Sequence, residues 1–417
     1  MKRPLGIYIH VPFCLKKCLY CDFCSYVGAD DTLRGRYVDA LCRHISQYRE
    51  LCSDREVDTV YFGGGTPTLL SPDQFAKVFS ALHESFTVSP DAEMTVECNP
   101  ATADLEKLRA LRRLGVNRLS IGVQSANDGE LASLGRVHSF ADARAVFSDA
   151  REAGFDNVSV DVMFGIPHQT RESFGRSLEE ILSLSPDHVS AYGLILEEGT
   201  PFYANSENLV LPDEDTEYNM YNDAWKTLES RGLSRYEISN FAASAFQSRH
   251  NLKYWHYDEY LGFGCSAHSL FGGKRFYAPR EIESYIAGCF TEGEDQTDPK
   301  NEFVMLGMRL TEGVDEAEFA RRFDQSFEAC YGRALKPFVD RGLVVRDGGR
   351  TRFSDAPDFR TRAFTSATPS SPRYCPLRIF RKALDKTHLF RYNISNEIID
   401  RGGSKWKKIS LNTTYIH

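Results

Sequence analysis

The chain has 417 residues and a formal net charge of −8, and 42% of its residues are hydrophobic and 26% are charged. This composition is that of an ordinary globular protein, and it excludes a wholly disordered chain, a collagen and a coiled-coil rod. The length allows about two or three domains, and no apolar run approaches the roughly 18 residues that a membrane-spanning helix needs.

The first residues lack the features of a secretory signal. Lys2 and Arg3 could begin one, but the stretch after them is short, contains His10 and Pro12, and reaches Cys14 without a small-residue cleavage site. We therefore expect the chain to start as a mature protein and to be cytoplasmic.

Alternating apolar and amphipathic segments cover the first 240 residues. Short apolar runs predict strands at 6–11, 58–62, 93–97, 118–123, 157–163 and 188–196. Amphipathic stretches predict helices at 32–51, 71–86, 103–114, 140–153, 171–184 and 213–231. Strands separated by helices imply βαβ units and a parallel sheet. We predict an α/β fold, a partial (β/α) barrel of about six units with its functional residues at the carboxyl ends of the strands.

The pattern changes after residue 240, and we divide the chain into four parts. Residues 1–240 form the barrel core, and 241–299 form a connecting region in which 248–273 is predicted to be irregular. Residues 300–354 form a small α+β C-terminal domain, a helical unit closed by a β-hairpin. Residues 355–417 form an atypical basic tail with no periodicity.

Charge is distributed unevenly between the tail and the rest. Residues 357–417 hold 12 basic and 4 acidic residues, which leaves 38 basic and 54 acidic residues elsewhere. An acidic main part argues against a nucleic-acid partner. We interpret the tail as disordered or as the product of a shifted reading frame, and we assign it no function.

The cysteines give the sharpest chemical signal. The chain has 11, an odd number, and four of them lie between residues 14 and 24, whereas a disulfide framework is even in number and typical of small secreted domains. Cys14, Cys18 and Cys21 follow a predicted strand at CxxxCxxC spacing and can bind three irons of a [4Fe–4S] cluster, leaving one iron open. Zinc is the alternative, but structural zinc sites pair CxxC motifs and no second motif follows.

Other candidate residues lie at the ends of later strands. The glycine-rich turn at 63–66 lets a backbone approach a ligand closely, although tight turns are the commonest use of such a sequence. Glu97, Gln124 and Asp161 each lie near the carboxyl end of a predicted strand and would face the barrel mouth. Alternatively, each satisfies only the N–H groups of a turn.

The segment 249–255 combines histidine, asparagine, tyrosine and tryptophan. His250 could cap a loop, or it could bind a haem iron axially with the aromatic rings on the macrocycle. His268 is a second candidate for such a role, but a histidine in a glycine-rich loop is more often simply hydrogen-bonded.

Residues 8–23 resemble the cluster loop of radical S-adenosylmethionine (SAM) enzymes. The resemblance is specific to the branch that contains oxygen-independent coproporphyrinogen III dehydrogenase and the HemW-type haem chaperones, and it extends from about residue 5 to about 346. It implies that SAM chelates the open iron through its amino and carboxyl groups, and that one electron from the cluster cleaves SAM to a 5′-deoxyadenosyl radical.

The resemblance also implies a set of cofactor contacts. Arg136 would bind the SAM carboxylate through a bidentate contact, and His250 would contact haem as part of an HNxxYW motif. The implied set is Tyr8, Tyr20, Gly64, Gly65, Thr66, Glu97, Gln124, Arg136, Asp161 and His250, with Cys14, Cys18 and Cys21 as metal ligands. No catalytic residue is assigned.

Two departures favour the chaperone over the dehydrogenase. The dehydrogenases have a fourth cysteine two residues after the third, where this chain has Phe23, and they have a longer segment before the cluster than the 13 residues that precede Cys14. Cys24, one residue later, is then a packed or surface thiol, with auxiliary cluster ligation as the minor alternative.

Two functions are therefore expected in order. The first is a haem chaperone with a [4Fe–4S] cluster and SAM, which passes haem to apo-haemoproteins such as membrane respiratory enzymes and depends on an electron donor; whether it is also an enzyme that cleaves SAM stays open. The alternative is coproporphyrinogen III dehydrogenase, which oxidatively decarboxylates two propionates to vinyl groups.

Overall fold

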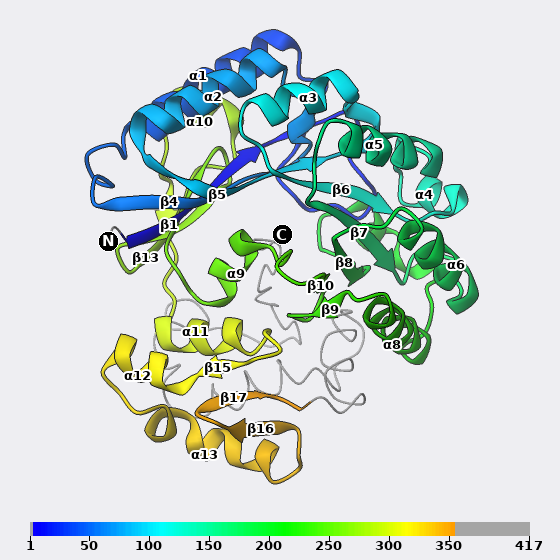
Figure 1. Cartoon of the computed structure of the whole chain (residues 1–417), viewed down its shortest axis with the longest axis vertical. Helices are drawn as coiled ribbons and strands as arrows, with labels where there is room; N and C mark the ends of the chain where they lie inside the picture. Colours follow the sequence, from blue (N-terminus) through cyan, green and yellow to red (C-terminus); the bar gives the residue numbers. More distant parts are fainter. Residues whose placement is uncertain (1–2, 355–417) are drawn as a thin grey trace, which may run out of the picture.

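A computed structural model describes residues 3–354 (Figure 1). The tail predicted at 355–417 lies outside the described residues. Within them, no helix is long and apolar enough to span a membrane.

Six parallel strands form the centre of the molecule, as the sequence predicts. They are β1 Arg3–Val11, β4 Arg55–Gly64, β5 Thr87–Cys98, β6 Arg118–Gln124, β7 Val158–Phe164 and β8 His188–Gly193. Each pairs in parallel with the next in this order. Together with shorter strands they make a sheet of 12 strands in the order β14-β13-β12-β11-β1-β4-β5-β6-β7-β8-β10-β9. The α/β partial barrel is therefore confirmed.

Helices cover the outer, convex face of this sheet (Figure 1). The long ones are α1 Asp31–Ser46, α2 Pro72–Ser85, α3 Leu105–Arg113, α5 Phe140–Glu152, α6 Arg171–Leu182 and α8 Glu214–Ser230, and short helices α4 Asp128–Ser133 and α7 Pro201–Ala204 stand in the connections. Local sequence explains their ends: Ser71 and Gln74 form a capping box at the start of α2, and Gly115 and Gly154 adopt positive φ just beyond α3 and α5.

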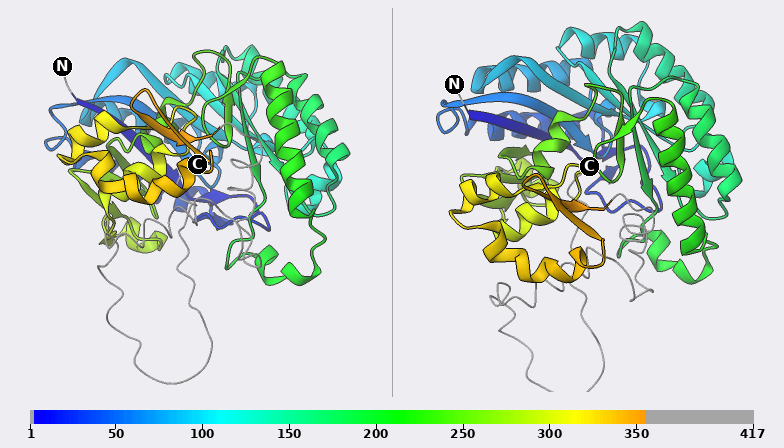
Figure 2. Two further views of the ribbon diagram at one scale, coloured as in Figure 1. Left: turned by 90° about the horizontal axis from the view of Figure 1, so that it is seen from below. Right: turned by 60° about the horizontal axis from the view of Figure 1, so that its bottom comes forward.

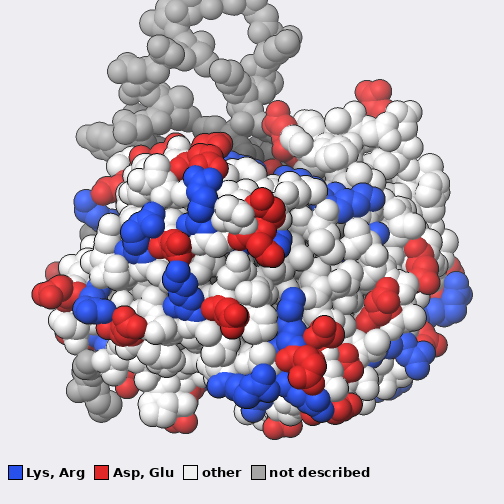
Figure 3. Space-filling model, turned by 90° about the horizontal axis from the view of Figure 1, so that it is seen from above, with Lys and Arg blue, Asp and Glu red and all other residues white. Residues whose placement is uncertain are grey.

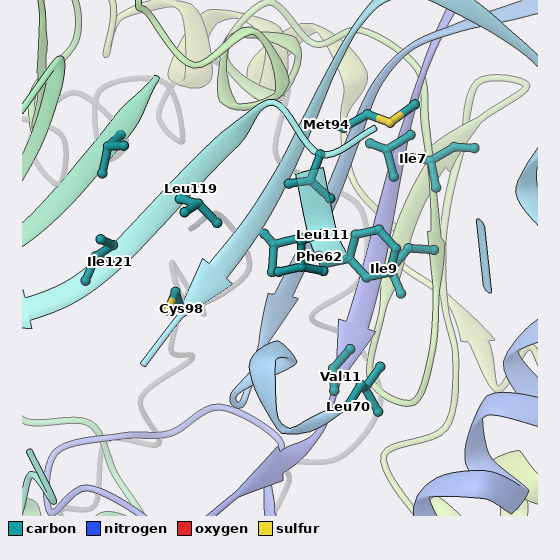
Figure 4. Packing of buried hydrophobic residues seen from close by; sticks show 14 of the residues in the cluster. Ile7, Ile9, Val11, Phe62, Leu70, Met94, Cys98, Leu111, Leu119 and Ile121 are labelled. Carbon is teal, nitrogen blue, oxygen red and sulfur yellow. The ribbon is translucent and has the colours of Figure 1, made fainter. Parts of the chain in front are cut away.

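Strand residues alternate between an apolar outer layer and a polar inner layer. Ile7, Ile9 and Val11 of β1 are fully buried, and Figure 4 shows them among the residues that pack between sheet and helices. The residues between them face inward, as do Glu97 of β5 and Asp161 of β7. Because a strand has a period of two, one strand supplies both layers.

The region after β8 differs from the prediction. Residues 248–273 were expected to be irregular, which is wrong: they hold helix α9 Arg249–Trp255 and strands β11 Tyr260–Phe263 and β12 His268–Phe271. β11 pairs in parallel with β1. Further short elements are β9 Ser234–Arg235, β10 Asn240–Ala242, β13 Lys274–Tyr277, α10 Ile282–Ile286 and β14 Gly293–Glu294. Elements this short show no readable periodicity, and their pairing with the barrel determines them.

The last described residues form a helical unit closed by a hairpin, as predicted. It comprises α11 Pro299–Gly307, β15 Val314–Asp315, α12 Glu316–Phe323, α13 Phe327–Val339, β16 Val344–Asp347 and β17 Arg350–Phe353. It has a core of its own around Phe319 and Tyr331. Gly348 and Gly349 have φ of 58° and 77° and make the two-residue turn of the hairpin. This C-terminal unit lies next to α9, away from the outer helices (Figures 1 and 2). The division of the chain at residues 240 and 299 stays a prediction.

The outer helical face carries charges of both signs. Figure 3 shows basic and acidic side chains interspersed on it. Several of them are paired between neighbouring helices, such as Arg36 with Glu283 at 2.8 Å and Arg109 with Glu152 at 2.9 Å. Exposed pairs of this kind stabilise a fold only slightly. Because charges of both signs are interspersed, this face presents no electrostatic field of a single sign.

Candidate functional site at the carboxyl ends of the strands

The cysteine loop lies directly beyond β1, between the two-residue strands β2 Phe13–Cys14 and β3 Tyr26–Val27. Its thiols at Cys14, Cys18 and Cys21 are free and partly buried. The N–H of Leu19 donates to the carbonyl of Leu134 at 3.1 Å, which attaches the loop to the end of α4. The loop is therefore held at the carboxyl ends of the strands, where the fold predicts chemistry.

The three thiols fit an iron–sulfur cluster. Burial, with a smaller contribution from the nearby Cys18 and Cys14, raises the pKa of Cys21 to about 12. A thiolate in this setting needs a cation beside it, as a cluster iron provides. Among the described residues, no three metal-binding side chains converge on a point that would hold a single ion. A zinc ion needs its ligands to meet at one point, whereas each thiolate of a [4Fe–4S] site binds a different iron.

The glycine turn after β4 packs against the start of the cysteine loop. Gly64 has a φ of +107°, and a Cβ added to it would lie 2.4 Å from the His10 ring. A Cβ on Gly65 would lie 2.7 Å from the carbonyl oxygen of Phe13. Both glycines are thus required by close packing against β1 and β2. The turn places Thr66 so that its hydroxyl donates to the sulfur of Cys14 at 3.7 Å.

Glu97 at the end of β5 is anchored from two sides. The hydroxyl of Tyr61 donates to its Oε1 at 2.9 Å, and the N–H of Gly64 donates to its Oε2 at 3.1 Å. Burial, reinforced by the negative charge of Asp161, raises the pKa of Glu97 to about 8. The glycine turn and the carboxylate therefore form one unit.

Asp161 and Gln124 lie on the next two strands. The hydroxyl of Ser120 donates to Asp161 Oδ1 at 3.4 Å, and burial raises the pKa of Asp161 to about 6. Gln124 has a φ of +69°, which a non-glycine residue adopts only when its surroundings enforce it. The hydroxyl of Tyr192 donates to its side-chain oxygen at 2.8 Å.

Arg136 joins these strands to the cysteine loop. Its Nη2 donates to the carbonyl of Gly122 at 2.7 Å and its Nη1 donates to the sulfur of Cys18 at 3.6 Å. Its Nε is buried and lacks a hydrogen-bond partner. A guanidinium has five N–H groups, so one that is buried beside the cluster loop and uses only some of them is suited to an anionic group. Tyr20 lies beside Arg136, close enough for the positive charge of the guanidinium to act on its hydroxyl group.

The structure thus brings together the residues expected around the cluster and SAM. Tyr8 belongs to the layer beneath them: its hydroxyl hydrogen-bonds with His10 Nδ1 at 3.0 Å, and its ring stacks on that of Tyr61 at 6.3 Å. Sequence reasoning missed Tyr61 and Arg118, which face inward from β4 and β6. Arg118 is among the largest fully buried side chains of the described residues. The signal that could have found them is the alternation of polar and apolar residues along each strand.

His250 lies inside the barrel rather than at its mouth, and it is completely buried. One ring nitrogen, Nδ1, hydrogen-bonds with Thr59 Oγ1 at 2.9 Å, and the other, Nε2, hydrogen-bonds with the Tyr254 hydroxyl at 2.8 Å. Burial lowers its pKa to about 3, so the ring is neutral. With both nitrogens hydrogen-bonded and no exposed edge, this geometry is the one that a structural role requires, and haem ligation by His250 stays a prediction.

Two further expectations concern residues outside this group. The ring of His268 stacks on Tyr277 at 5.2 Å and its Nδ1 lies 3.2 Å from the carbonyl oxygen of Ser266, so it is the hydrogen-bonded residue that the glycine-rich loop suggests. Cys24 is buried and its thiol donates to the carbonyl of Arg280 at 3.4 Å. This is the arrangement of a packed thiol.

The geometry agrees with the families that the chain matches. A model described as the Radical SAM superfamily matches residues 8–181, and one described as the HemN C-terminal domain matches residues 295–356. The Heme chaperone HemW of Bacillus subtilis is 37% identical over 348 residues, which cover 81% of this chain and 92% of the relative. The protein of the same name from Escherichia coli is 34% identical over 349 residues, 82% of this chain and 90% of the relative.

Two other similarities extend the picture. The mouse Radical S-adenosyl methionine domain-containing protein 1, mitochondrial, is 39% identical over 270 residues, 64% of this chain and 60% of the relative. The solved structure of the radical SAM enzyme coproporphyrinogen III oxidase (HemN) from Escherichia coli superposes with a TM-score of 0.76 at 23% identity, over 93% of this chain and 91% of that one. At this identity the likeness is one of fold.

Proposed function

This chain belongs to the HemW family of haem chaperones within the radical SAM superfamily, and from that membership we propose that it binds haem and delivers it to apo-haemoproteins. It does so as a protein with a [4Fe–4S] cluster and SAM. Membrane respiratory enzymes are the recipients that we propose, and a separate reductant supplies the cluster with electrons. We place the protein in the cytoplasm, where its thiols stay reduced; the ten cysteines of the described residues are all free.

One observation supports the cluster and SAM part of this proposal: hydrogen bonds join the cysteine loop to the strand ends. Thr66 reaches Cys14 and Arg136 reaches Cys18, so the residues that would hold SAM touch the residues that would hold the cluster. Cys14, Cys18 and Cys21 are the proposed iron ligands. When bound, the cluster supplies single electrons and an open iron position for SAM.

The chain's own residues would orient SAM rather than react with it. Arg136 binds the SAM carboxylate through N–H groups of its guanidinium that the protein leaves available, and Gly64, Gly65 and Thr66 contact the methionine part. Glu97, Gln124 and Asp161 surround the ribose and adenine. Tyr8, in the layer beneath the site, and Tyr20, beside Arg136, complete the contacts with SAM.

The enzyme alternative has less support. The likeness to coproporphyrinogen III oxidase is one of fold, whereas the chaperones match over most of both chains. In addition, Phe23 occupies the position at which the dehydrogenases carry a fourth cysteine.

Anaerobic reconstitution followed by two parallel assays tests the proposal. We expect the reconstituted protein to hold four irons per chain, to bind haem with a Soret band distinct from that of free haem, and to leave coproporphyrinogen III unchanged when SAM and a reductant are present. Cys18→Ala should lose the cluster, whereas Cys289→Ala, at an exposed position, should keep it. Conversion of coproporphyrinogen III to protoporphyrinogen would overturn the chaperone assignment.

A further inference from the structure

Helix α9 lies on the inner side of the curved sheet and is anchored to the strands beneath the site (Figure 1). The carboxylate of Glu93 on β5 accepts the N–H groups of Arg249 and His250, each at 2.9 Å. This places a negative charge at the start of the helix, where the helix dipole favours it. Lys253, one turn later, donates to Asp58 on β4 at 2.8 Å. The helix is therefore fixed to two strands that also carry site residues.

His250 contacts the residue that orients Glu97. Its ring stacks on the ring of Tyr61, with centroids 5.2 Å apart and planes 25° apart. Tyr8 stacks on Tyr61 at 6.3 Å, and the Tyr61 hydroxyl donates to Glu97. Tyr61 thus has an aromatic contact from α9 and one from β1, and a single hydroxyl that points at the site.

The hydrogen bonds of His250 explain why a histidine suits this position. Thr59 is on the same strand as Tyr61, and Tyr254 is on the same helix as His250. By hydrogen-bonding to both, the imidazole fixes its own plane relative to β4. An aliphatic residue could fill the space, but it would leave two buried hydroxyls without a partner and offer no flat surface to Tyr61.

We propose that His250 is a positioning residue of the SAM site: it holds Tyr61 so that the Tyr61 hydroxyl fixes Glu97 beside the glycine turn. This rests on the proposed function, in which Glu97 contacts SAM. Without the bond from Tyr61, Glu97 keeps only the bond from the Gly64 N–H.

Two substitutions of His250 separate positioning from iron ligation. His250→Phe keeps a flat ring against Tyr61 but cannot bind iron. It also loses the hydrogen bonds to Thr59 and Tyr254, so it should unfold at a lower temperature than wild type. His250→Gln keeps hydrogen-bonding groups but removes the ring. SAM affinity is measured by titrating SAM into the reduced, reconstituted protein and following the change in the EPR signal of the cluster. Iron content and thermal unfolding check that each variant is folded and loaded.

We expect His250→Gln to weaken SAM binding about tenfold, the effect of one lost oriented contact, and His250→Phe to stay within about threefold of wild type. Tyr61→Phe should also weaken binding about tenfold, and the double variant Tyr61→Phe with His250→Gln should lose no more than either alone, because both act through the same hydroxyl. Full SAM affinity in His250→Gln, or additive losses in the double variant, would overturn the proposal.

Haem titration of the same proteins keeps this inference distinct from the proposed function. If His250 only holds Tyr61 in place, the Soret band of the haem complex should be unchanged in His250→Phe. If that variant loses the band while SAM affinity is unchanged in both His250 variants, His250 ligates iron and the positioning role is wrong. If the wild-type protein binds no haem but the SAM losses occur as predicted, the chaperone function fails and the positioning role stands.

Discussion

The inner layer of the barrel keeps ionisable side chains in protonation states that they would not have in water. Glu97 and Asp161 both have raised pKa values, of about 8 and about 6, and burial is the main cause in each case. Arg118 offsets part of this effect with its buried positive charge. Two carboxyl groups near one cation do not both ionise readily, so Glu97 is largely neutral at pH 7 before SAM arrives. A neutral carboxyl can donate as well as accept a hydrogen bond.

This state of Glu97 predicts a dependence of stability on pH. Between its ordinary value of 4.5 and its value of about 8 in the folded protein, the folded chain holds a proton that the unfolded chain has released. The free energy of unfolding should therefore fall as the pH rises through this window, by up to about 1.4 kcal/mol per pH unit for one proton. Glu97→Gln should remove this contribution, as measured by thermal unfolding of SAM-free protein from pH 5 to 8.

Glu217 provides the matched control. Burial raises its pKa to about 8 as well, but it lies on α8 and belongs to no part of the site. Glu217→Gln should flatten the same pH profile and leave SAM affinity unchanged, whereas Glu97→Gln should change both. Parallel pH profiles for Glu97→Gln and wild type would contradict the raised pKa.

Arg136 gives a second prediction for a single residue. Its guanidinium donates to Gly122 and to Cys18 from two nitrogens at once, and a lysine ammonium cannot reproduce that fork. Arg136→Lys should weaken SAM binding about tenfold or more and leave iron content near wild type, as measured by EPR titration and iron analysis. Arg109→Lys, at an exposed ion pair with Glu152, should change neither quantity. Wild-type SAM affinity in Arg136→Lys would remove Arg136 from the site.

At the scale of elements, the site depends on how tightly the turn after β4 meets β1. Gly64 combines a backbone conformation open mainly to glycine with contact to the His10 ring. Gly154, at the end of α5, has a φ of +87° but nothing within 4 Å of an added Cβ. The two glycines therefore separate backbone strain from packing.

We expect Gly154→Ala to lower the free energy of unfolding by about 1–2 kcal/mol through strain alone. Gly64→Ala should cost about 1–3 kcal/mol beyond that because of overpacking, and it should reduce iron incorporation because Thr66 and Cys14 move apart. Chemical denaturation and iron analysis of both variants measure this. Equal losses of stability with full iron content in both would show that the contact with His10 is unimportant.

The sequence predicts those elements whose periodicity is long enough to read. The six parallel strands and their helices are apparent because apolar runs and amphipathic stretches alternate over many residues. Helix α9 is only seven residues long and β11 only four, and their aromatic composition gives no period, so only pairing with β1 and contact with β4 define them.

The site could be predicted only where spacing carries the chemistry. Cys14, Cys18 and Cys21 lie close together in the sequence, and the turn at 63–66 follows a strand directly. The alternation of polar and apolar residues places Tyr61 and Arg118 on the inner face of their strands, but their partners lie on other strands, so no local pattern reveals their roles. A sequence motif alone does not define the surroundings of His250. Its neighbours in the sequence suggest an iron ligand, whereas in the structure its two ring nitrogens hydrogen-bond with the hydroxyl groups of Thr59 and Tyr254.

At the scale of the molecule, α9 is held between the barrel and the C-terminal unit. Trp255 packs in an apolar cluster with Tyr254, Tyr260 and Leu310, so the outer side of the helix touches the segment after α11. Arg309 lies over the Trp255 ring at 4.1 Å and pairs with Glu237 at 3.1 Å. The C-terminal unit is thus coupled to the helix that carries His250, and through it to Tyr61 and Glu97.

The Arg309–Glu237 pair is the strongest test of this coupling. The side chain of Glu237 is 0% exposed, so Arg309→Met leaves a buried carboxylate without its cation and should cost about 3–5 kcal/mol. Lys336→Met, at an exposed pair with Asp340, should cost about 0–1 kcal/mol. Thermal unfolding gives both values, and limited proteolysis should release the C-terminal unit earlier in Arg309→Met.

A second variant, in which Glu237 is made neutral, decides whether its unpaired charge causes the loss of stability in Arg309→Met. In the double variant Arg309→Met with Glu237→Gln, the buried amide still accepts from the Ser239 N–H, as Glu237 Oε1 does at 2.8 Å, and no charge remains unpaired. Most of the lost stability should return, because breaking a buried pair costs more than replacing it. SAM affinity should fall in Arg309→Met and recover in the double variant if α9 transmits the disturbance to Tyr61. Recovery of stability without recovery of SAM affinity would instead mean that the C-terminal unit fixes α9 through Trp255 and its apolar neighbours, with the ion pair serving stability alone.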